Sequence, residues 1–258
     1  MPTRKPTAPT LPPLDGVALR DAIFDRIWRA VLEHRLPPGT KLVEDRLAEL
    51  FATSRAQVRD VLARLAHEGV VDMVPNRGAF IASPTPEQTR EVFEARRLLE
   101  PALVRRLIAR RDAAATATLR AVVADEQQAR ERADRPAIVR LSGWFHIELA
   151  RLAANRPLAR TMRELATMTV LAIFLYDAPH ATACREDEHE QLLNAIERRR
   201  SERVICVHRA RRLPTVAPTG NLSAPVKRPP RALVRKVRRK IGKWLLPPEQ
   251  LRSRRAPR

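Results

Sequence analysis

The chain of 258 residues has very few cysteines, and this scarcity restricts the class of protein. Its two cysteines, Cys184 and Cys206, cannot build the disulfide framework of a small secreted domain, so we expect inert thiols. The sequence also has no signal peptide and no apolar run of about 18 residues, which argues against secretion and against a membrane-spanning helix. These absences predict a cytoplasmic protein without stable membrane insertion.

Signatures of catalysis are absent as well. The sequence has no glycine-rich phosphate loop, no nucleophile elbow and no pair of carboxylates that it would place in a shared cleft. We therefore do not expect an enzyme, and the remaining patterns have to be interpreted as binding functions.

The positive charge of the chain is unevenly distributed. The formal net charge is +20, but residues 198–258 hold 20 of the 49 Lys and Arg residues and only two acids, Glu202 and Glu249. The other 197 residues are nearly balanced, with 29 basic and 27 acidic side chains. The overall charge therefore describes a basic tail and says little about the folded domains.

The segment Leu36–Ala82 carries the clearest functional pattern. Residues Glu44–Phe51 place apolar side chains on one face at helical spacing, and a short turn follows. Ser54 then begins a second helix with Gln57 three residues later, which predicts a capping box. The apolar stripe of this second helix consists of Val58, Val61, Leu62 and Leu65.

The polar face of the second helix carries Arg55 and Arg59, which are four residues apart and therefore on the same side. Two strands, Val70–Val74 and Ala79–Ala82, surround a hairpin tip that contains Arg77. A capped helix N-terminus can hold phosphate while arginines read guanine edges, and a wing arginine suits a narrow minor groove. Surface arginines alone would fit any amphipathic helix, but this order of elements predicts a winged helix-turn-helix that binds double-stranded DNA.

These motifs resemble the GntR family of bacterial transcription regulators. The resemblance is carried by PPGTKLVEDRLAELF, SRAQVRDVLARLAHEGVV and PNRGAFIA. Three later stretches, VFEARRLLEPALVRRLIARR, WFHIELARLAANRPLART and DEHEQLLNAIE, resemble the all-helical FCD-type effector domain of the FadR-like subgroup. The resemblance runs from about Leu19 to Ala210 and implies a ligand-responsive regulator that binds a palindromic operator as a homodimer.

The resemblance also implies which residues contact DNA. The family commonly has Thr-Pro after Ser-Arg, whereas this chain has Ala56 and Gln57, which removes one hydroxyl from the contact surface. Arg46 or Asp45 is implied as a neighbour of the DNA backbone. The recognition helix and the wing contribute Ser54, Arg55, Ala56, Gln57, Arg59, Arg77 and Gly78.

We expect a mainly α protein in which an antiparallel helical bundle follows the winged helix-turn-helix. The expected parts are a disordered leader at 1–13, the DNA-binding domain at 14–83, the effector-binding bundle at 84–212 and a tail at 213–258. Apolar periodicity predicts bundle helices at Pro86–Arg111, Ala113–Ala133, Pro136–Ala154, Pro157–Tyr176 and Glu186–Arg198. Bundles of this kind bind small ligands between their helices.

Two histidines of the bundle, His146 and His189, occupy positions at which similar effector domains hold a divalent metal. The resemblance implies a carboxylate four residues before the first His, but this chain has Ser142 there, and Arg211 occupies the last ligand position. Because two ligands are replaced, zinc or nickel at His146 and His189 is the lesser expectation. We favour two polar histidines in a ligand cavity.

Arg96 allows two interpretations. It can anchor the carboxylate of a small organic acid, since arginine binds carboxylates bidentately, with His146 and His189 as further donors. It can also form an ion pair with Glu100, four residues later on the same helix.

The tail Leu213–Arg258 has eight prolines and 13 basic residues against one acid, so we expect it to be disordered and absent from the core. Within it, Arg231–Leu246 has apolar residues on one side, a pattern suited to an anionic membrane or to nucleic-acid phosphate. We favour the alternative that the tail results from translation of the coding sequence in a shifted reading frame.

For the whole chain, two alternatives to a regulator stay open. One is a helical small-molecule or metal-binding module, and the other is a protein that binds nucleic acid or membranes non-specifically through its tail.

Overall fold

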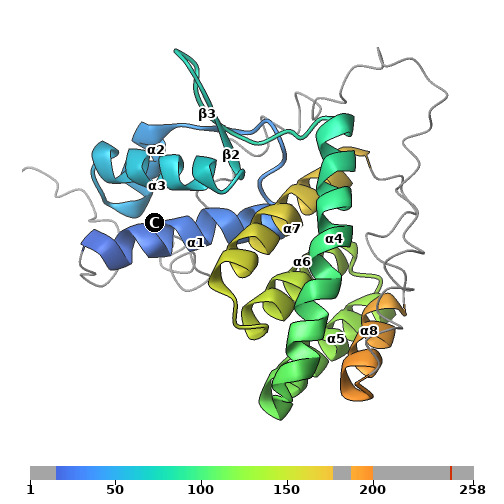
Figure 1. Cartoon of the computed structure of the whole chain (residues 1–258). Helices are drawn as coiled ribbons and strands as arrows, with labels where there is room; N and C mark the ends of the chain where they lie inside the picture. Colours follow the sequence, from blue (N-terminus) through green and yellow to red (C-terminus); the bar gives the residue numbers. More distant parts are fainter. Residues whose placement is uncertain (1–15, 177–186, 200–244, 246–258) are drawn as a thin grey trace, which may run out of the picture.

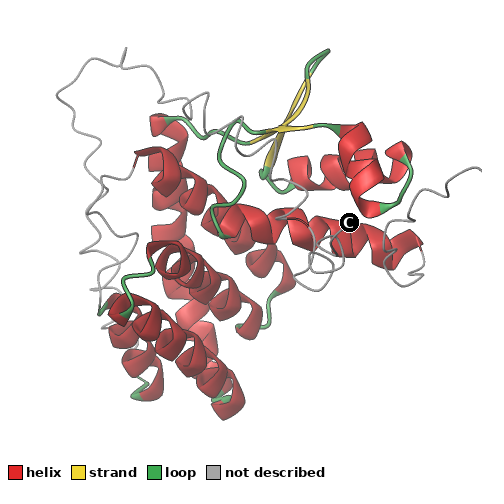
Figure 2. Cartoon of the chain, turned by 180° about the vertical axis from the view of Figure 1, so that it is seen from behind, coloured by secondary structure: helices red, strands yellow, loops and turns green. Residues whose placement is uncertain are grey.

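The structure is a computed structural model, and it describes residues 16–176, 187–199 and 245. These residues form eight helices and one small sheet, which confirms the mainly α fold class. The helices make up the body of the molecule, and a β-hairpin projects from it in both views (Figure 1, Figure 2). Several expectations concern residues outside this described part: the leader 1–13, Cys184, Cys206, Arg211 and the tail except Leu245.

The N-terminal part consists of three helices and a three-stranded antiparallel sheet. The helices are α1 (Gly16–Leu32), α2 (Glu44–Phe51) and α3 (Arg55–His67), and the strands are β1 (Lys41–Leu42), β2 (Val71–Val74) and β3 (Gly78–Ile81). The strand order is β1-β3-β2, so that the central strand pairs with both neighbours. The predicted helix-turn-helix and hairpin are present, whereas α1 and the two-residue β1 were not predicted.

The N-terminus of α3 is capped as predicted, but only on one side. The Ser54 hydroxyl oxygen accepts a hydrogen bond from the Gln57 backbone N–H at 3.2 Å. The side chain of Gln57 makes no return bond to the Ser54 backbone; its Oε1 atom accepts a hydrogen bond from the Thr53 hydroxyl instead. The prediction of a full capping box at this helix is therefore wrong, although one orphan N–H of the first turn is satisfied.

The hairpin between β2 and β3 turns within a few residues. Asn76 and Gly78 have φ values of 59° and 92°, in the left-handed region that asparagine and glycine adopt most easily. The Arg77 N–H closes the turn by donating to the Val74 carbonyl oxygen at 3.0 Å. Arg77 and Gly78 are exposed at the tip of this projecting hairpin.

The helical bundle follows the predicted boundaries to within a few residues. It contains α4 (Pro86–Arg110), α5 (Ala113–Glu131), α6 (Arg135–Leu152), α7 (Arg156–Tyr176) and α8 (Glu188–Glu197). A complete capping box of Thr85 and Gln88 begins α4, and the side chains of Asp112 and Asp134 cap α5 and α6. None of the described helices combines the length and apolar character that a bilayer crossing requires.

The N-terminal part and the bundle share one hydrophobic core. Buried residues of α1, α2 and α3 form a cluster that continues into α6 and α7 through Val139, Ile147, Ala166, Val170 and Leu171. Leu245 belongs to the same cluster, since it is 1% exposed and its carbonyl oxygen accepts a hydrogen bond from Arg26 Nη1 at 3.4 Å. The expectation that the tail is absent from the core is therefore wrong at Leu245.

Candidate DNA-binding surface and ligand site

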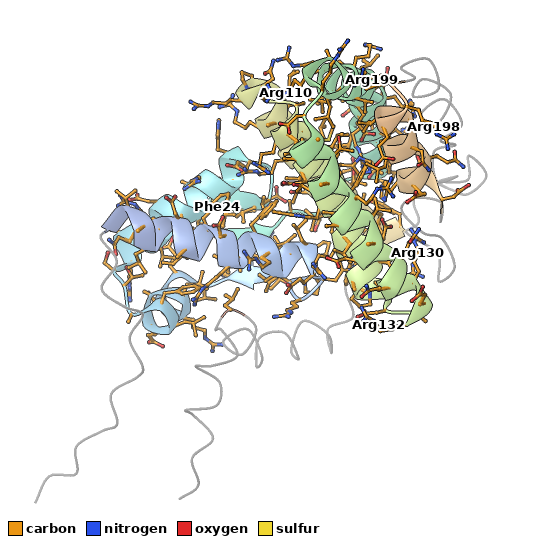
Figure 3. All side chains as sticks on the ribbon, turned by 90° about the horizontal axis from the view of Figure 1, so that it is seen from below. Phe24, Arg110, Arg130, Arg132, Arg198 and Arg199 are labelled. Atoms are coloured by element: carbon orange, nitrogen blue, oxygen red, sulfur yellow. The ribbon has the colours of Figure 1, made fainter. Side chains whose placement is uncertain are left out.

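The residues predicted to contact DNA lie on α2, on the first turns of α3 and at the hairpin tip. Most of them are exposed to solvent, and Gln57 is half-buried. Behind this surface, α1 supports α3: the guanidinium carbon of Arg64 on α3 lies 4.2 Å from the centre of the Phe24 ring. Figure 3 labels Phe24 on α1. The exposed residues are Arg46, Ser54, Arg55, Ala56, Arg59, Arg77 and Gly78.

Arg55 and Arg59, the two arginines in the first turns of α3, contact acidic side chains from the first turn of α2. Arg59 Nη2 lies 2.9 Å from Glu44 Oε2, and this hydrogen bond and the negative charge of Glu44 raise the pKa of Arg59. Arg55 Nε forms an ion pair with Asp45. Sequence reasoning did not find the partnership of Glu44 with Arg59, because the two residues belong to different helices and share no periodicity.

Inside the bundle, Arg96 is 3% exposed and contacts polar groups of its own helix α4 and of α7. Its Nε atom lies 2.6 Å from Glu100 Oε1, which confirms the predicted ion pair within α4. Its Nη1 atom donates to the Thr169 hydroxyl on α7 at 2.9 Å. Its Nη2 atom is buried without a hydrogen-bond partner in the described part of the chain, although buried donors of this kind are normally paired with an acceptor.

The two predicted histidines contact one another. His146 Nε2 on α6 lies 3.2 Å from His189 Nε2 on α8. The outer nitrogens face carboxylates: His189 Nδ1 lies 2.6 Å from Glu126 Oε2, and His146 Nδ1 lies 3.3 Å from Glu100 Oε1. Because an ionised carboxylate only accepts hydrogen bonds, the contact with Glu126 assigns a proton to His189 Nδ1.

Glu126 stays ionised although it is buried. Burial alone raises the pKa of this carboxyl, but the hydrogen bond and charge of His189, aided by Arg130, outweigh burial and lower it. Arg130 Nη2 lies 2.7 Å from Glu126 Oε1. Sequence reasoning missed Glu126, because a glutamate in an alanine-rich helix is usually exposed to solvent and nothing in the neighbouring sequence marks this one as buried. Its burial depends on a histidine that is 63 residues away in sequence.

The described residues do not supply the metal ligand set that the family resemblance implies. They contain no group of three or more His, Cys, Asp or Glu side chains that could hold a metal ion. The two Nε2 atoms face each other, while the nearby carboxylates lie on the Nδ1 sides and orient the rings. Ser142, at the position of the implied carboxylate, is buried, and Arg211 lies outside the described part. Within the described residues, His146 and His189 thus belong to a buried polar cluster with Glu100 and Glu126.

Helix α7 contacts the N-terminal part with several side chains. The indole N–H of Trp28 on α1 donates to the Thr167 hydroxyl at 3.0 Å in a buried hydrogen bond. Arg163 lies 3.8 Å from a carboxylate oxygen of Glu68, the residue that ends α3, and its guanidinium carbon lies 5.6 Å from the centre of the Trp28 ring. The same helix carries Thr169, which accepts from Arg96 in the bundle interior. One helix thus contacts both the buried Arg96 and the C-terminal end of α3.

Comparison with known proteins assigns two parts of the chain to families. Residues 19–81 match the model of the bacterial regulatory proteins of the gntR family, and residues 91–210 match the FCD domain. The structure of E. coli McbR/YncC superposes with a TM-score of 0.63 at 20% identity, over 74% of this chain and 90% of that chain. At this identity the likeness concerns the fold.

Relatives with sequence similarity are transcription regulators. An HTH-type regulator of Agrobacterium vitis, from the TAR-I ttuE-ttuC' intergenic region, is 31% identical over 138 residues, which cover 52% of this chain and 80% of that protein. The Nta operon transcriptional regulator of Aminobacter aminovorans is 27% identical over 134 residues, or 52% of this chain and 63% of that protein. The chain is thus a member of the GntR family of DNA-binding transcription regulators, which are not enzymes, with an FCD domain behind its helix-turn-helix domain.

Proposed function

We propose that this GntR regulator binds a palindromic operator as a homodimer in the cytoplasm and responds to a small organic acid. The DNA-binding domain would comprise residues 14–83 and the effector domain residues 84–212. The observation that carries the proposal is that α7 contacts both the buried Arg96 and the end of α3. A ligand bound at Arg96 can thereby change the position of α3.

The proposed DNA contacts follow from the chemistry of the exposed surface. Ser54 leaves the N-terminus of α3 open to phosphate, and Arg55 and Arg59 project from its first turns, where arginine pairs with guanine in the major groove. Ala56, Gln57 and the neighbouring Arg46 complete the helix surface. Arg77 and Gly78 at the hairpin tip would enter the minor groove beside it.

The proposed effector site is centred on Arg96 and the two histidines. The Nη2 atom of Arg96 is buried without a hydrogen-bond partner in the described residues, and a ligand carboxylate would satisfy it. His146 and His189 lie in the same buried polar network, since both Arg96 and His146 contact Glu100. Because Glu100 already pairs with the charge of Arg96, the ligand is selected by the unpartnered N–H donor of Nη2, which favours a ligand with a strong hydrogen-bond acceptor such as a carboxylate.

The homodimer is proposed from the symmetry of a palindromic site, because paired half-sites require a two-fold protein. Sedimentation equilibrium of the full chain should give a mass twice the 29.3 kDa of the chain at micromolar concentration. A mass that stays at that of a single chain, both free and on DNA, would contradict the dimer.

A calorimetric titration of the full chain with a panel of small mono- and dicarboxylic acids tests the effector site. Arg96→Lys keeps the charge beside Glu100 but loses the planar fork, so it should weaken binding of the best acid about tenfold or more. The exposed Arg105 on the same helix provides the control, and Arg105→Lys should bind like the wild type. Equal binding by the Arg96→Lys protein, or equal binding of the corresponding amides, would refute an acid anchored at Arg96.

A further inference from the structure

The DNA-reading arginines of α3 are not free in the protein, because α2 presents an acid to each of them. Glu44 contacts Arg59 with both carboxylate oxygens: Oε2 lies 2.9 Å from Nη2, and Oε1 lies 3.4 Å from Nε. Asp45 contacts Arg55 at Nε. Two consecutive acids at the start of one helix therefore hold the two arginines of the next.

The atoms used by Glu44 leave a defined part of Arg59 available. Guanidinium has five N–H groups in a planar fork, and Nε and Nη2 form its side edge. Glu44 occupies that edge, so Nη1 and the second N–H of Nη2 remain at the end of the fork. Two such parallel N–H groups are what the O6 and N7 atoms of guanine accept.

The fold does not depend on this contact. The side chains of Arg59 and Glu44 are 66% and 28% exposed, and exposed ion pairs of this kind contribute little to stability. A carboxylate on a surface that meets DNA also repels phosphate, which lowers affinity for every sequence. Glu44 thus stabilises the fold little and weakens the general attraction to DNA. Its presence is explained if it increases the discrimination between DNA sequences.

We propose that Glu44 is a specificity-determining residue, which holds Arg59 with the end of its fork toward a guanine and reduces binding to other sequences. Asp45 has the same role toward Arg55. The inference rests on the proposed function, in which Arg55 and Arg59 read bases. Glu44 acts through Arg59 and is a positioning residue.

The test compares two DNA probes, a duplex pool enriched from a random library by the full wild-type chain and the unselected library. The ratio of the two affinities at physiological salt measures discrimination. Glu44→Gln keeps the size of the side chain and removes its charge, so the ratio should fall about three- to tenfold, while binding to the unselected library strengthens. Glu49→Gln removes the same charge from an exposed position of α2 and should change the ratio less than about twofold.

A second variant separates positioning from a general charge effect. In the background of Arg59→Ala, Glu44→Gln should have no further effect on the ratio, because there is no guanidinium left to orient. Melting temperatures of all variants verify that each protein is folded. An unchanged ratio in Glu44→Gln, or an equal fall with and without Arg59, overturns the role of Glu44 while base reading by Arg59 stands. An unchanged ratio in Arg59→Ala alone instead refutes the proposed DNA contact, and with it the inference.

Discussion

Trp28 on α1 donates its indole N–H to Thr167 on α7, and this buried hydrogen bond of 3.0 Å joins residues 139 positions apart in sequence. It lies where the DNA-binding part and the bundle share their hydrophobic core. Because the two parts are joined by packing and by a directed polar contact, a movement of α7 can be transmitted to α1 and α3.

The first prediction concerns this junction. Trp28→Phe removes the donor and part of the buried ring, and should lower the free energy of unfolding by about 1–3 kcal/mol. Urea unfolding at neutral pH measures the change. Trp144, which packs at 6.1 Å from Trp28 but is 37% exposed, is the matched control, and Trp144→Phe should cost clearly less. Equal costs for both variants would show that the junction is not fixed by Trp28.

The second prediction concerns pH. Burial, helped by the charge of Arg135, lowers the pKa of His34 from 6.5 to about 4, and its ring packs edge-on against Phe174 of α7. The folded protein therefore prefers neutral His34. The stability that this preference contributes is complete above about pH 6.5 and is lost as the pH falls toward 4.

Unfolding free energies at pH 7 and pH 5 test this assignment. His34→Asn removes the titrating group and suits the positive φ of this residue, so the pH-dependent loss should shrink by about 1–2 kcal/mol relative to the wild type. If wild type and variant lose the same stability between the two pH values, His34 is not the group that titrates.

The third prediction concerns metal content. We expect the purified protein to hold substoichiometric zinc or nickel, since two imidazoles without further ligands in the described residues bind a metal weakly. Elemental analysis after dialysis measures the content, and Ser142→Asp should raise zinc affinity by restoring a carboxylate one helical turn before His146. About one tightly held metal per wild-type chain would contradict the polar-cavity interpretation.

The fourth prediction concerns Leu245. Its burial in the core that the N-terminal part shares with the bundle predicts that Leu245→Ala lowers the free energy of unfolding by about 2–4 kcal/mol. Leu98 on α4 is 76% exposed, and Leu98→Ala is the control that should cost almost nothing. A Leu245→Ala protein as stable as this control would contradict the burial of Leu245. It would support the expectation from composition that the tail is absent from the core.

Patterns within one helix or hairpin were predictable from sequence. The helical spacing of Glu44–Phe51, the cap at Ser54 and the hairpin around Arg77 each depend on neighbouring residues, and the structure has them. The two-residue β1 was not predictable, because a strand so short has no periodicity and forms only when β3 is in place.

Contacts between distant helices were the part that sequence could not provide. The pairing of Glu44 with Arg59, the burial of Glu126 against His189 and the place of Leu245 in the core all depend on how the helices pack. For Arg96 the sequence offered two partners and could not decide between them. In the structure, Arg96 Nε lies 2.6 Å from Glu100 Oε1. The ligand role of Arg96 uses a different donor of the same side chain and remains a prediction.

The most direct test of the account is the DNA affinity of the full chain for its enriched duplex pool and for the unselected library, at physiological salt. The wild type should prefer the enriched pool by about a thousandfold or more. Arg55→Ala and Arg59→Ala should each reduce binding to the enriched pool by about tenfold to a hundredfold and change binding to the library much less. Equal losses on both DNAs would mean that these arginines only touch phosphate, and would contradict base reading by α3.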